Sequence, residues 1–515
     1  MIKIKAQSSL LIAAFNAVML LCYNYTFWQH IPNSYVVPLA VLLFSIYYAA
    51  LTLVNFKYTL KPVLLFLLCV ACPSAYFMDS YGFIFSTQTV QTTTGTNARE
   101  IWEVLNFKLL PYLLLGVVFA IIIIKIKLRY PKFKFVLLHF FIALSLIFVN
   151  IALFSKSYSV FLRNNKPARY YLNPLRPIYA SAKYYVTHLS YQNKGVNFTI
   201  LDPTPQRTQP QSKPRLIVLV LGESDRAANH SLNSYSRNTD PLLRARTDIY
   251  SFTDFYSCGT ETSLSVPCMF SNLGREHYNY VTGRYTENVL DLLQKSQVQV
   301  LWRDNDGGCQ NVCNRVPTED FNKAQIKPFC NGFECHDEVL LHNMQDYISN
   351  NIGDKLIVLH KKGNHGPAYY KRYPAKFEQF GPVCKARELK SCMSQEIINA
   401  YDNILLYNDY FLDQLIKQLE ANQDQYQTAM IYVSDHGESL GEKSIYLHAL
   451  PYWMAPKEQI HIPFIFWASK DFVVNRQHIA EIKHQTWSHD NLFHTLLGLY
   501  DIESSVYVAD LDIFS

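Results

Sequence analysis

A hydroxyl-rich segment between two cysteines, SCGTETSLSVPCMFS at residues 257–271, contains the residue types that covalent catalysis needs. A threonine hydroxyl is a weak nucleophile at neutral pH, and coordination to a metal ion is one way to activate it. A disulfide across the segment would brace the loop around Thr260 and Thr262, and a helix that begins there would favour an incoming phosphate. From composition alone a serine- and threonine-rich surface loop is the simpler interpretation, so a catalytic role requires metal ligands elsewhere in the chain.

Acidic and histidine side chains follow several short apolar runs in the C-terminal half, and they are ligand types that Zn²⁺ takes in proteins. Any one of them alone is more simply a loop residue or a helix cap. Their shared position after apolar runs favours a metal site, and Gly437 permits the chain to break away directly after two of them. The residues are Glu223, Asp304, His360, His365, Asp435 and His436.

The apolar runs before these residues are rich in β-branched side chains and are typical of buried parallel strands. Helical patterns separate them, such as residues 396–420, so we expect an α/β domain with a mainly parallel sheet. Such sheets bind ligands at the carboxyl ends of their strands, and five strands would deliver acids and histidines to one edge. The expected strands are residues 215–221, 298–302, 355–360, 429–434 and 462–467.

The eleven cysteines fall into two groups. Cys22, Cys69 and Cys72 lie in apolar segments, where a cysteine behaves as a small buried hydrophobe. The other eight form close pairs after residue 250. This favours disulfides and an oxidising compartment over structural zinc sites, because these eight lack CxxC pairs with interleaved histidines. The pairs are Cys258 with Cys268, Cys309 with Cys313, Cys330 with Cys335, and Cys384 with Cys392.

Five apolar stretches before residue 155 are long enough to span a bilayer, which takes roughly 17–25 residues. Lysines and arginines cluster at the N-terminus and in the loops around residues 57–61 and 125–134, which we therefore expect on the cytoplasmic side. Five spans then place the C-terminal domain outside the cytoplasm, in agreement with the cysteine pairs. The stretches are residues 8–27, 36–55, 61–78, 107–124 and 134–154.

Three parts are expected in this chain of 515 residues. Residues 1–155 would form a five-helix transmembrane domain, residues 156–213 interfacial helices and a linker, and residues 214–515 the catalytic domain. The middle part mixes basic and aromatic side chains before a proline- and glutamine-rich stretch, which suits a lipid headgroup layer followed by an extended linker. The net charge of +6 gives no reason to expect nucleic acid as a partner, whereas basic residues near the apolar segments indicate a membrane surface.

Five ordered motifs resemble those of the phosphoethanolamine transferases that modify lipid A and other parts of lipopolysaccharide. This family includes the mobile colistin-resistance enzymes and belongs to the alkaline phosphatase/sulfatase-like superfamily. The resemblance covers essentially the whole chain and implies five membrane helices and a sulfatase-like α/β domain on the periplasmic side of a bacterial inner membrane. The motifs are LGESDRAANHSLNSYSRNTDP, SCGTETSLSVPCMFS, LWRDNDGGC, LHKKGNHGPAYYKRYP, and SDHGESLGE with its trailing LH.

The resemblance also implies a mechanism. Thr262 would attack the phosphorus of phosphatidylethanolamine, release diacylglycerol and carry phosphoethanolamine covalently. A phosphate or sugar hydroxyl of the acceptor lipid would then take the group in a second step, as expected for covalent catalysis. One zinc ion, with a second left open, would serve the reaction, and the ligands of the first would be Glu223, Thr262, Asp435 and His436.

Further residues around this centre are implied by the same resemblance. His365 and His448 match a second histidine pair, which contacts substrate phosphate or a second metal ion. His360 and Glu438 would support the ligands from behind, as residues around metal sites commonly do.

Two departures from the family pattern concern the substrates. Thr96 and Glu100 match residues at the donor headgroup site, but Thr92 stands where asparagine is usual. Gln310 replaces a lysine that often follows the WRDN sequence, and glutamine supplies no positive charge to a phosphate. The acceptor therefore stays open between a lipid A phosphate, Kdo and heptose.

Other functions fit the residues less well. A membrane phosphoglycerol transferase that acts on a glycopolymer also uses five helices and a threonine, but lacks the CGTxTxxSVPC pattern. A sulfatase would need the C-x-P-x-R signature, and a catalytically silent membrane scaffold would lack the ligands. We therefore expect a monomeric enzyme whose product masks phosphate charge, which opposes cationic peptides such as polymyxin.

Overall fold

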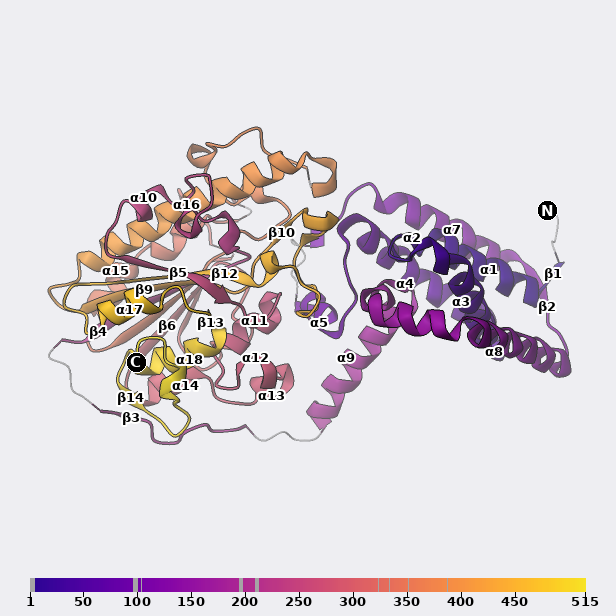
Figure 1. Cartoon of the computed structure of the whole chain (residues 1–515), viewed down its shortest axis with the longest axis horizontal. Helices are drawn as coiled ribbons and strands as arrows, with labels where there is room; N and C mark the ends of the chain where they lie inside the picture. Colours follow the sequence, from indigo (N-terminus) through magenta and orange to yellow (C-terminus); the bar gives the residue numbers. More distant parts are fainter. Residues whose placement is uncertain are drawn as a thin grey trace. The chain divides into compact units, whose positions relative to one another are not determined.

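The computed structural model describes residues 5–95, 101–102, 104–193, 198–208, 213–322, 324–332, 334–350, 352–386 and 388–515. Contacts within the chain divide it into two compact units (Figure 1). The first comprises Met1–Val90 and Leu105–Val186 and is mainly helical. The second comprises Gln91–Val104 and Thr187–Ser515 and contains the large sheet.

Each of the five expected apolar stretches is mainly helical, but the first, residues 8–27, is divided between α1 and the short helix α2 (Tyr25–Gln29). Three of these helices, among the described residues, are long and apolar enough to cross a membrane: α3 (Asn33–Leu53), α4 (Leu60–Tyr81) and α8 (Phe133–Asn164) through Ser159. The other two, α1 (Ser8–Cys22) and α7 (Leu109–Lys125), are apolar but have only 15 and 17 residues. The first unit is thus a helical membrane region with three helices, among the described residues, that are long enough to span a bilayer.

The packing of the first unit joins the short helices to a long one. Phe15 of α1, Leu64 and Leu68 of α4, and Ile123 of α7 belong to one buried apolar cluster. The helix α8 continues past residue 155, because residues 156–164 contain no glycine or proline to end it.

An eight-stranded mixed sheet organises the second unit. Its order is β13-β5-β12-β9-β4-β8-β6-β7, and the run from β9 to β7 is parallel. We call the edge at which β4, β6, β8 and β9 end the carboxyl edge, and the opposite one the amino edge. The strands are β4 (Arg215–Gly222), β5 (Ile249–Tyr256), β6 (Gln299–Asp304), β7 (Thr318–Asp320), β8 (Lys355–His360), β9 (Gln427–Ser434), β12 (His461–Ala468) and β13 (Trp487–Ser488).

The direction of β12 corrects one expectation. All five predicted strands are present, but β12 runs antiparallel to both of its neighbours, β9 and β5. Four of the predicted strands, rather than five, therefore end at the carboxyl edge. Hydrophobicity could not show this, because a strand buried on both faces is apolar throughout in either direction.

Helices cover both faces of the sheet, as Figure 1 shows, and divide the core in two. Alternate side chains of β4 point to opposite faces, as the pleat of a strand requires, so every residue of β4 is buried. The predicted helix at 396–420 is observed as α16. One face carries α15 (Met344–Asn350) and α16 (Ser394–Glu420), and the other carries α14 (Val289–Lys295) and α18 (Leu492–Gly498).

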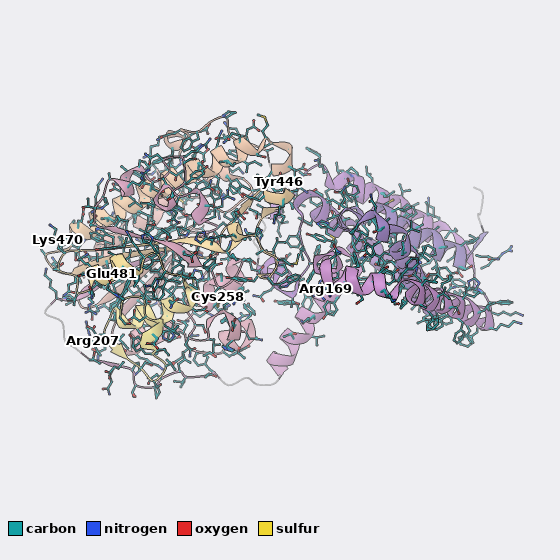
Figure 2. All side chains as sticks on the ribbon, in the orientation of Figure 1. Arg169, Arg207, Cys258, Tyr446, Lys470 and Glu481 are labelled. Carbon is teal, nitrogen blue, oxygen red and sulfur yellow. A yellow bond between two sulfur atoms is a disulfide. The ribbon has the colours of Figure 1, made fainter. Side chains whose placement is uncertain are left out.

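The four close cysteine pairs, whose exact pairing the sequence left open, are disulfides, and the Cys258–Cys268 bridge closes the hydroxyl-rich segment (Cys258 is labelled in Figure 2). Of the three free cysteines only Cys72 is buried as expected, whereas Cys22 and Cys69 are exposed. The difference arises because an apolar helix can carry a cysteine on its outward face as readily as in its packed face.

Candidate metal and nucleophile site

Glu223, Asp435 and His436 come together at the carboxyl edge. Glu223 directly follows β4 and Asp435 directly follows the neighbouring strand β9. The two strands are parallel and pair Gly222 with Ser434, so the residues that follow them start side by side. One ligand atom from each of the three residues lies within 4.8 Å of the others, and all three are completely buried.

Hydrogen bonds fix the orientation of these side chains. Nδ1 of His436 lies 2.9 Å from the carbonyl oxygen of Gly437, which only accepts, so Nδ1 carries the proton and Nε2 presents a lone pair to the cluster. Nε2 lies 3.3 Å from Oδ2 of Asp435 and 3.5 Å from Oε1 of Glu223. Oδ1 of Asp435 accepts the backbone N–H groups of Ser224 and His436. An imidazole held through its other nitrogen is the usual arrangement of a metal ligand.

Two glycines permit the close packing around the cluster. A Cβ at Gly437 would lie 2.1 Å from the backbone oxygen of Glu458, so close approach rather than a special backbone angle requires this glycine. Gly363 has a φ of +48°, and a Cβ there would lie 2.8 Å from the backbone oxygen of Glu223. Both loops can therefore pass directly against the ligands.

Thr262 lies at the cluster as the first residue of α11 (Thr262–Met269). Its hydroxyl donates to Oε2 of Glu223 over 3.0 Å, and the hydroxyl oxygen is 3.4 Å from Nε2 of His436. Thr260 serves another purpose, because its hydroxyl donates to the carbonyl of Leu450. The structure thus separates the two threonines of the segment, with Thr262 at the acids and Thr260 anchoring the loop.

Burial strongly disfavours negative charge at this site. Burial, with the charge of Asp435 close by, raises the pKa of Glu223 well above its ordinary range. Burial also raises the pKa of Asp435 to about 6 and lowers the pKa of His436 well below its usual value. When both are ionised, two buried carboxylates that face each other favour a positive charge beside them, which a bound cation would supply.

The second histidine pair borders the cluster. The ring of His448 is centred 4.3 Å from the ring of His436, and its Nδ1 is 3.0 Å from Oε2 of the buried Glu438. Burial lowers the pKa of His448, but acidic neighbours, led by Glu438, raise it to about 9. The ring of His365 lies 6.3 Å from that of His448, and its buried Nδ1 has no hydrogen-bond partner among the described residues. Glu438 thus orients His448, and His365 stands further from the cluster.

His360 lies behind Glu223 at the end of β8. Its Nδ1 is 2.8 Å from Oδ2 of Asp304, which ends the neighbouring strand β6 in register with it. Burial lowers the pKa of His360, but Asp304, Asp306 and Glu223 raise it to about 9. The three carboxylates therefore favour a positive charge at this ring.

The predicted donor-headgroup residues cannot be placed. Thr96 and Glu100 lie outside the described residues, and the side chain of Thr92, in α5 (Thr87–Gly95), is not described either. Gln310 lies in the loop after β6 with a left-handed φ of 49°.

Sequence reasoning missed three residues of the site. His489 is completely buried and bridges the end of β9 to the disulfide loop, since its Nε2 donates to the carbonyl of Ser434 and its Nδ1 accepts from the N–H of Cys258. Ser265 donates to the carbonyl of Asp435. Asp306 lies two residues after β6, beside His360. Nothing near His489 in the sequence indicates its role, whereas Ser265 and Asp306 lie inside motifs that had been noted for other residues.

Two family models match the chain, one for each unit. The model described as phosphoethanolamine transferase EptA/EptB matches residues 43–189, and the sulfatase model matches residues 215–502. Among curated proteins, phosphoethanolamine transferase EptA of Escherichia coli strain K12 is 37% identical over 98% of this chain and 95% of its own length. Phosphatidylethanolamine transferase Mcr-1 of Escherichia coli is 38% identical over 93% of this chain and 92% of its own length.

A solved structure supports the same assignment. The integral membrane lipooligosaccharide phosphoethanolamine transferase A of Neisseria meningitidis superposes with a TM-score of 0.92 and 32% identity over 99% of both chains. The soluble domain of the same Neisseria protein is 41% identical over 62% of this chain, with a TM-score of 0.60. The chain therefore belongs to the EptA/EptB phosphoethanolamine transferase family, within the sulfatase superfamily.

Proposed function

We propose that this protein transfers phosphoethanolamine from phosphatidylethanolamine to lipid A or another lipopolysaccharide component, with Thr262 as nucleophile at a zinc site. The observation that carries the proposal is the Thr262 hydroxyl, which donates to Glu223 beside the buried ligands Asp435 and His436. Family membership supports the reaction class. The acceptor is supported by a Salmonella typhimurium relative named Kdo(2)-lipid A phosphoethanolamine 7''-transferase, which is 30% identical over 55% of this chain.

The residues at the site fit a zinc ion. Two carboxylates, an imidazole and a hydroxyl are donors that zinc takes. Oδ2 of Asp435 is buried and has no hydrogen-bond partner among the described residues, which costs free energy unless a cation lies beside it. Bound zinc would supply positive charge that activates the hydroxyl and offsets the charge of the phosphoryl group. The residues that would hold it are Glu223, Thr262, Asp435 and His436.

The first half of the reaction loads the threonine. The Thr262 oxygen attacks the phosphorus of phosphatidylethanolamine, the bond from phosphorus to the diacylglycerol oxygen breaks, and diacylglycerol leaves with the hydroxyl proton. Glu223 accepts the hydrogen bond of the hydroxyl and so directs its lone pairs. Because Thr262 begins α11, the positive end of the helix dipole lies beside it and favours the anionic phosphoryl group.

The second half unloads it. A phosphate oxygen or hydroxyl of the acceptor attacks the phosphothreonine, the bond from phosphorus to Thr262 breaks, and Thr262 regains a proton. His448, which is held by Glu438 and lies next to His436, would contact the phosphoryl group in both halves. This assignment makes His448 a binding residue and leaves the nucleophile role to Thr262 alone.

The membrane location supports the same function, because donor and acceptor are both lipids and a tethered site shortens the search. We propose five inner-membrane spans, with α1 and α7 crossing beside α4, and a catalytic domain in the periplasm. The shared apolar cluster of α1, α4 and α7 supports five spans. Four disulfides and the basic cytoplasmic loops support the periplasmic side.

Mass spectrometry of lipid A and core from cells that express the chain tests the proposal. The intact protein should add the mass of one phosphoethanolamine, and Thr262→Ala should abolish the addition while the protein still inserts. Thr260→Ala is the matched control, because it removes the neighbouring hydroxyl and should leave transfer detectable. Equal addition by Thr262→Ala would rule out the nucleophile. Addition of glycerol phosphate to a glycopolymer would favour the phosphoglycerol transferase alternative, which the full-length relatives do not favour.

A further inference from the structure

We infer that a second divalent cation of the zinc class binds beside the first, between Glu223, Asp306 and His360. One ligand atom from each of these residues lies within 4.8 Å of the others. Glu223 and His360 are completely buried, and the side chain of Asp306 is only 8% exposed. Two carboxylates and an imidazole are the ligands of many zinc sites, and the imidazole disfavours Ca²⁺ and Mg²⁺ as occupants.

The ring of His360 is held in the way that a metal ligand is held. Its Nδ1 bonds to the carboxylate of Asp304, and histidines that bind metals usually direct their second nitrogen at such a carboxylate. Its Nε2 is buried and has no hydrogen-bond partner among the described residues. The separation from Nε2 to Oδ2 of Asp306 is 3.8 Å, which is too long for a hydrogen bond. Two ligands that each lie about 2 Å from one zinc ion can have this separation.

Asp304 sets the position of both new ligands. Its Oδ2 holds His360, and its Oδ1 accepts the backbone N–H groups of Asp306, Gly307 and Gly308 at 2.9–3.1 Å. These bonds turn the loop after β6 back towards the end of β8. A single carboxylate thus positions one ligand from each of two neighbouring strands, which a chance cluster of acids would not require.

Glu223 belongs to both ligand groups and would connect the two cations. Enzymes that transfer phosphoryl groups often use two ions roughly 3.5–4 Å apart. The histidine pair His365 and His448 is the competing place for a second ion. Within the described residues, however, no group of three acid, cysteine or histidine ligands of this compactness includes either of them. Binding of the second cation does not depend on the transfer reaction, although its contact with a phosphoryl oxygen rests on the proposed function.

The test measures zinc bound to the purified full-length protein after equilibration with Zn²⁺ and removal of excess metal. The wild type should hold two equivalents. Asp306→Asn and His360→Gln should each hold one, and Asp304→Asn should weaken binding of the second ion about 10–100-fold. The double variant His365→Ala/His448→Ala is the matched control and should still hold two.

Anomalous scattering at the zinc edge from wild-type crystals gives an answer that needs no substitution. We expect two peaks, one of them beside His360. A single equivalent in the wild type, a single peak, or loss of the second ion from the His365/His448 variant instead of Asp306→Asn would overturn the inference. Because metal content is the readout, these outcomes are separate from those of the lipid A experiment.

Discussion

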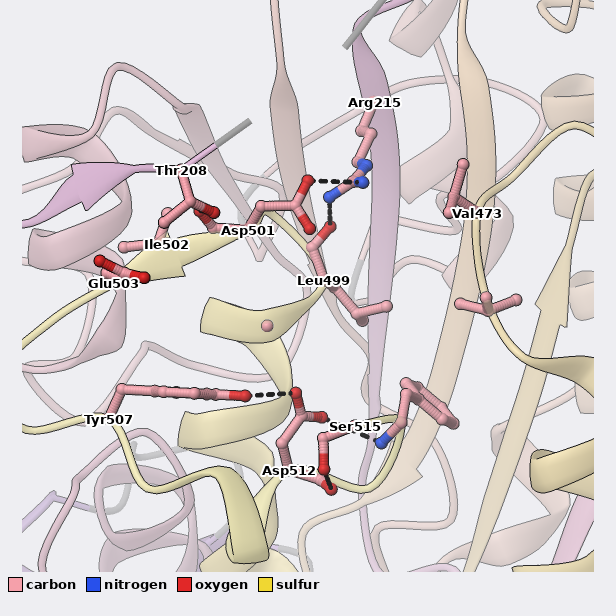
Figure 3. A pocket seen from close by; sticks show the side chains of 13 residues that line it. Thr208, Arg215, Val473, Leu499, Asp501, Ile502, Glu503, Tyr507, Asp512 and Ser515 are labelled. Carbon is pink, nitrogen blue, oxygen red and sulfur yellow. Dashed lines mark hydrogen bonds and ion pairs between the residues drawn. The ribbon is translucent and has the colours of Figure 1, made fainter. Parts of the chain in front are cut away.

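The buried charged groups at the amino and carboxyl edges of the sheet differ in their partners. At the amino edge, where β4 begins, the guanidinium of Arg215 is only 2% exposed. It pairs with Asp501 at 2.8 Å and donates a hydrogen bond to the carbonyl of Leu499. A cavity of about 360 Å³ lies beside this pair (Figure 3). At the carboxyl edge, about 26 Å along the same strand, Glu223 and Asp435 are fully buried and Oδ2 of Asp435 has no hydrogen-bond partner among the described residues. At the amino end of β4 the buried charge pairs with another residue of the chain, whereas at the carboxyl end one buried carboxylate oxygen has no hydrogen-bond partner among the described residues.

The site that we propose lies at the edge with the partnerless carboxylate oxygen, and not at the edge with the cavity. A buried ion pair within the chain needs no further partner. Buried acids without one cost free energy, and proteins retain such groups where a ligand or a reaction uses them. The cavity at the amino edge is lined by Arg215 and Asp501, whose opposite charges already pair with each other.

The largest effect should come from Asp435→Asn, which removes one buried negative charge from the carboxyl edge. Transfer to lipid A should fall by at least about 100-fold, because a metal ligand is lost. In chelator, by contrast, the variant should melt at a higher temperature than the wild type, since the buried charge is gone. Transfer at the wild-type rate, or a lower melting temperature than the wild type in chelator, would contradict the claim that Asp435 carries a buried charge that a metal ion offsets.

The same aspartate-to-asparagine change at the amino edge should lower stability and leave transfer unchanged. Asp501→Asn leaves Arg215 without its partner, and asparagine tolerates the left-handed φ of 52° at this position. Stability should fall by about 1–3 kcal/mol, less than for a fully buried pair because Asp501 is 27% exposed, while transfer and zinc content stay unchanged. Thermal unfolding and zinc analysis check both points, and loss of zinc would show that the edges are not independent.

A smaller effect should arise at Asp409 of α16, where a proton balances the buried charge. Burial, together with the charges of Asp240 and Asp413, raises the pKa of Asp409 to about 7, although its oxygens accept the N–H groups of Leu242 and Leu243. Because the folded protein binds this proton more tightly than the unfolded chain, its contribution to stability is complete below about pH 4 and is lost as pH rises through 7.

Asp409→Asn should therefore flatten the decline in stability between pH 5 and pH 8, since asparagine stays neutral and keeps an acceptor oxygen. Melting temperatures at the two pH values measure the effect. Asp471→Asn is the control, because, despite burial, hydrogen bonds from Lys213 and Ser469 lower the pKa of the Asp471 carboxyl. If the pH dependence of stability in Asp409→Asn equals that of the wild type, a proton on Asp409 does not stabilise the folded protein.

The smallest effect should come from blocking the cavity at the amino edge. Val473 lines the cavity and is exposed, so Val473→Phe should fill part of it without disturbing the core. Transfer should stay within about twofold of the wild type, a change of less than about 0.5 kcal/mol in the activation free energy. A larger loss, measured by the same lipid A assay, would give the amino edge a role in the reaction.

Much of this site could be predicted because its ligands follow strands that are visible in the sequence. The runs that form β4 and β9 are buried and apolar, and Glu223, Asp435 and His436 directly follow them. Once those strands are neighbours, the three side chains meet. The family motifs added Thr262, which composition alone did not separate from Thr260.

The remainder depended on contacts that a linear pattern does not contain. The direction of β12 is set by its partners β9 and β5, and β5 itself was missed because polar residues interrupt its apolar ones in IYSFTDFY. His489 reaches the site from more than fifty residues away from Ser434 along the chain, and the approach of Asp306 to His360 depends on backbone hydrogen bonds to Asp304.

The most direct test of the central claim is peptide mass spectrometry of the protein after brief incubation with phosphatidylethanolamine and an acid quench. If the buried acids and His436 hold a cation against the Thr262 hydroxyl, phosphoethanolamine should be found on Thr262, and chelator or Asp435→Asn should prevent it. Turnover with an unmodified Thr262, or with the group on another residue, would contradict the account.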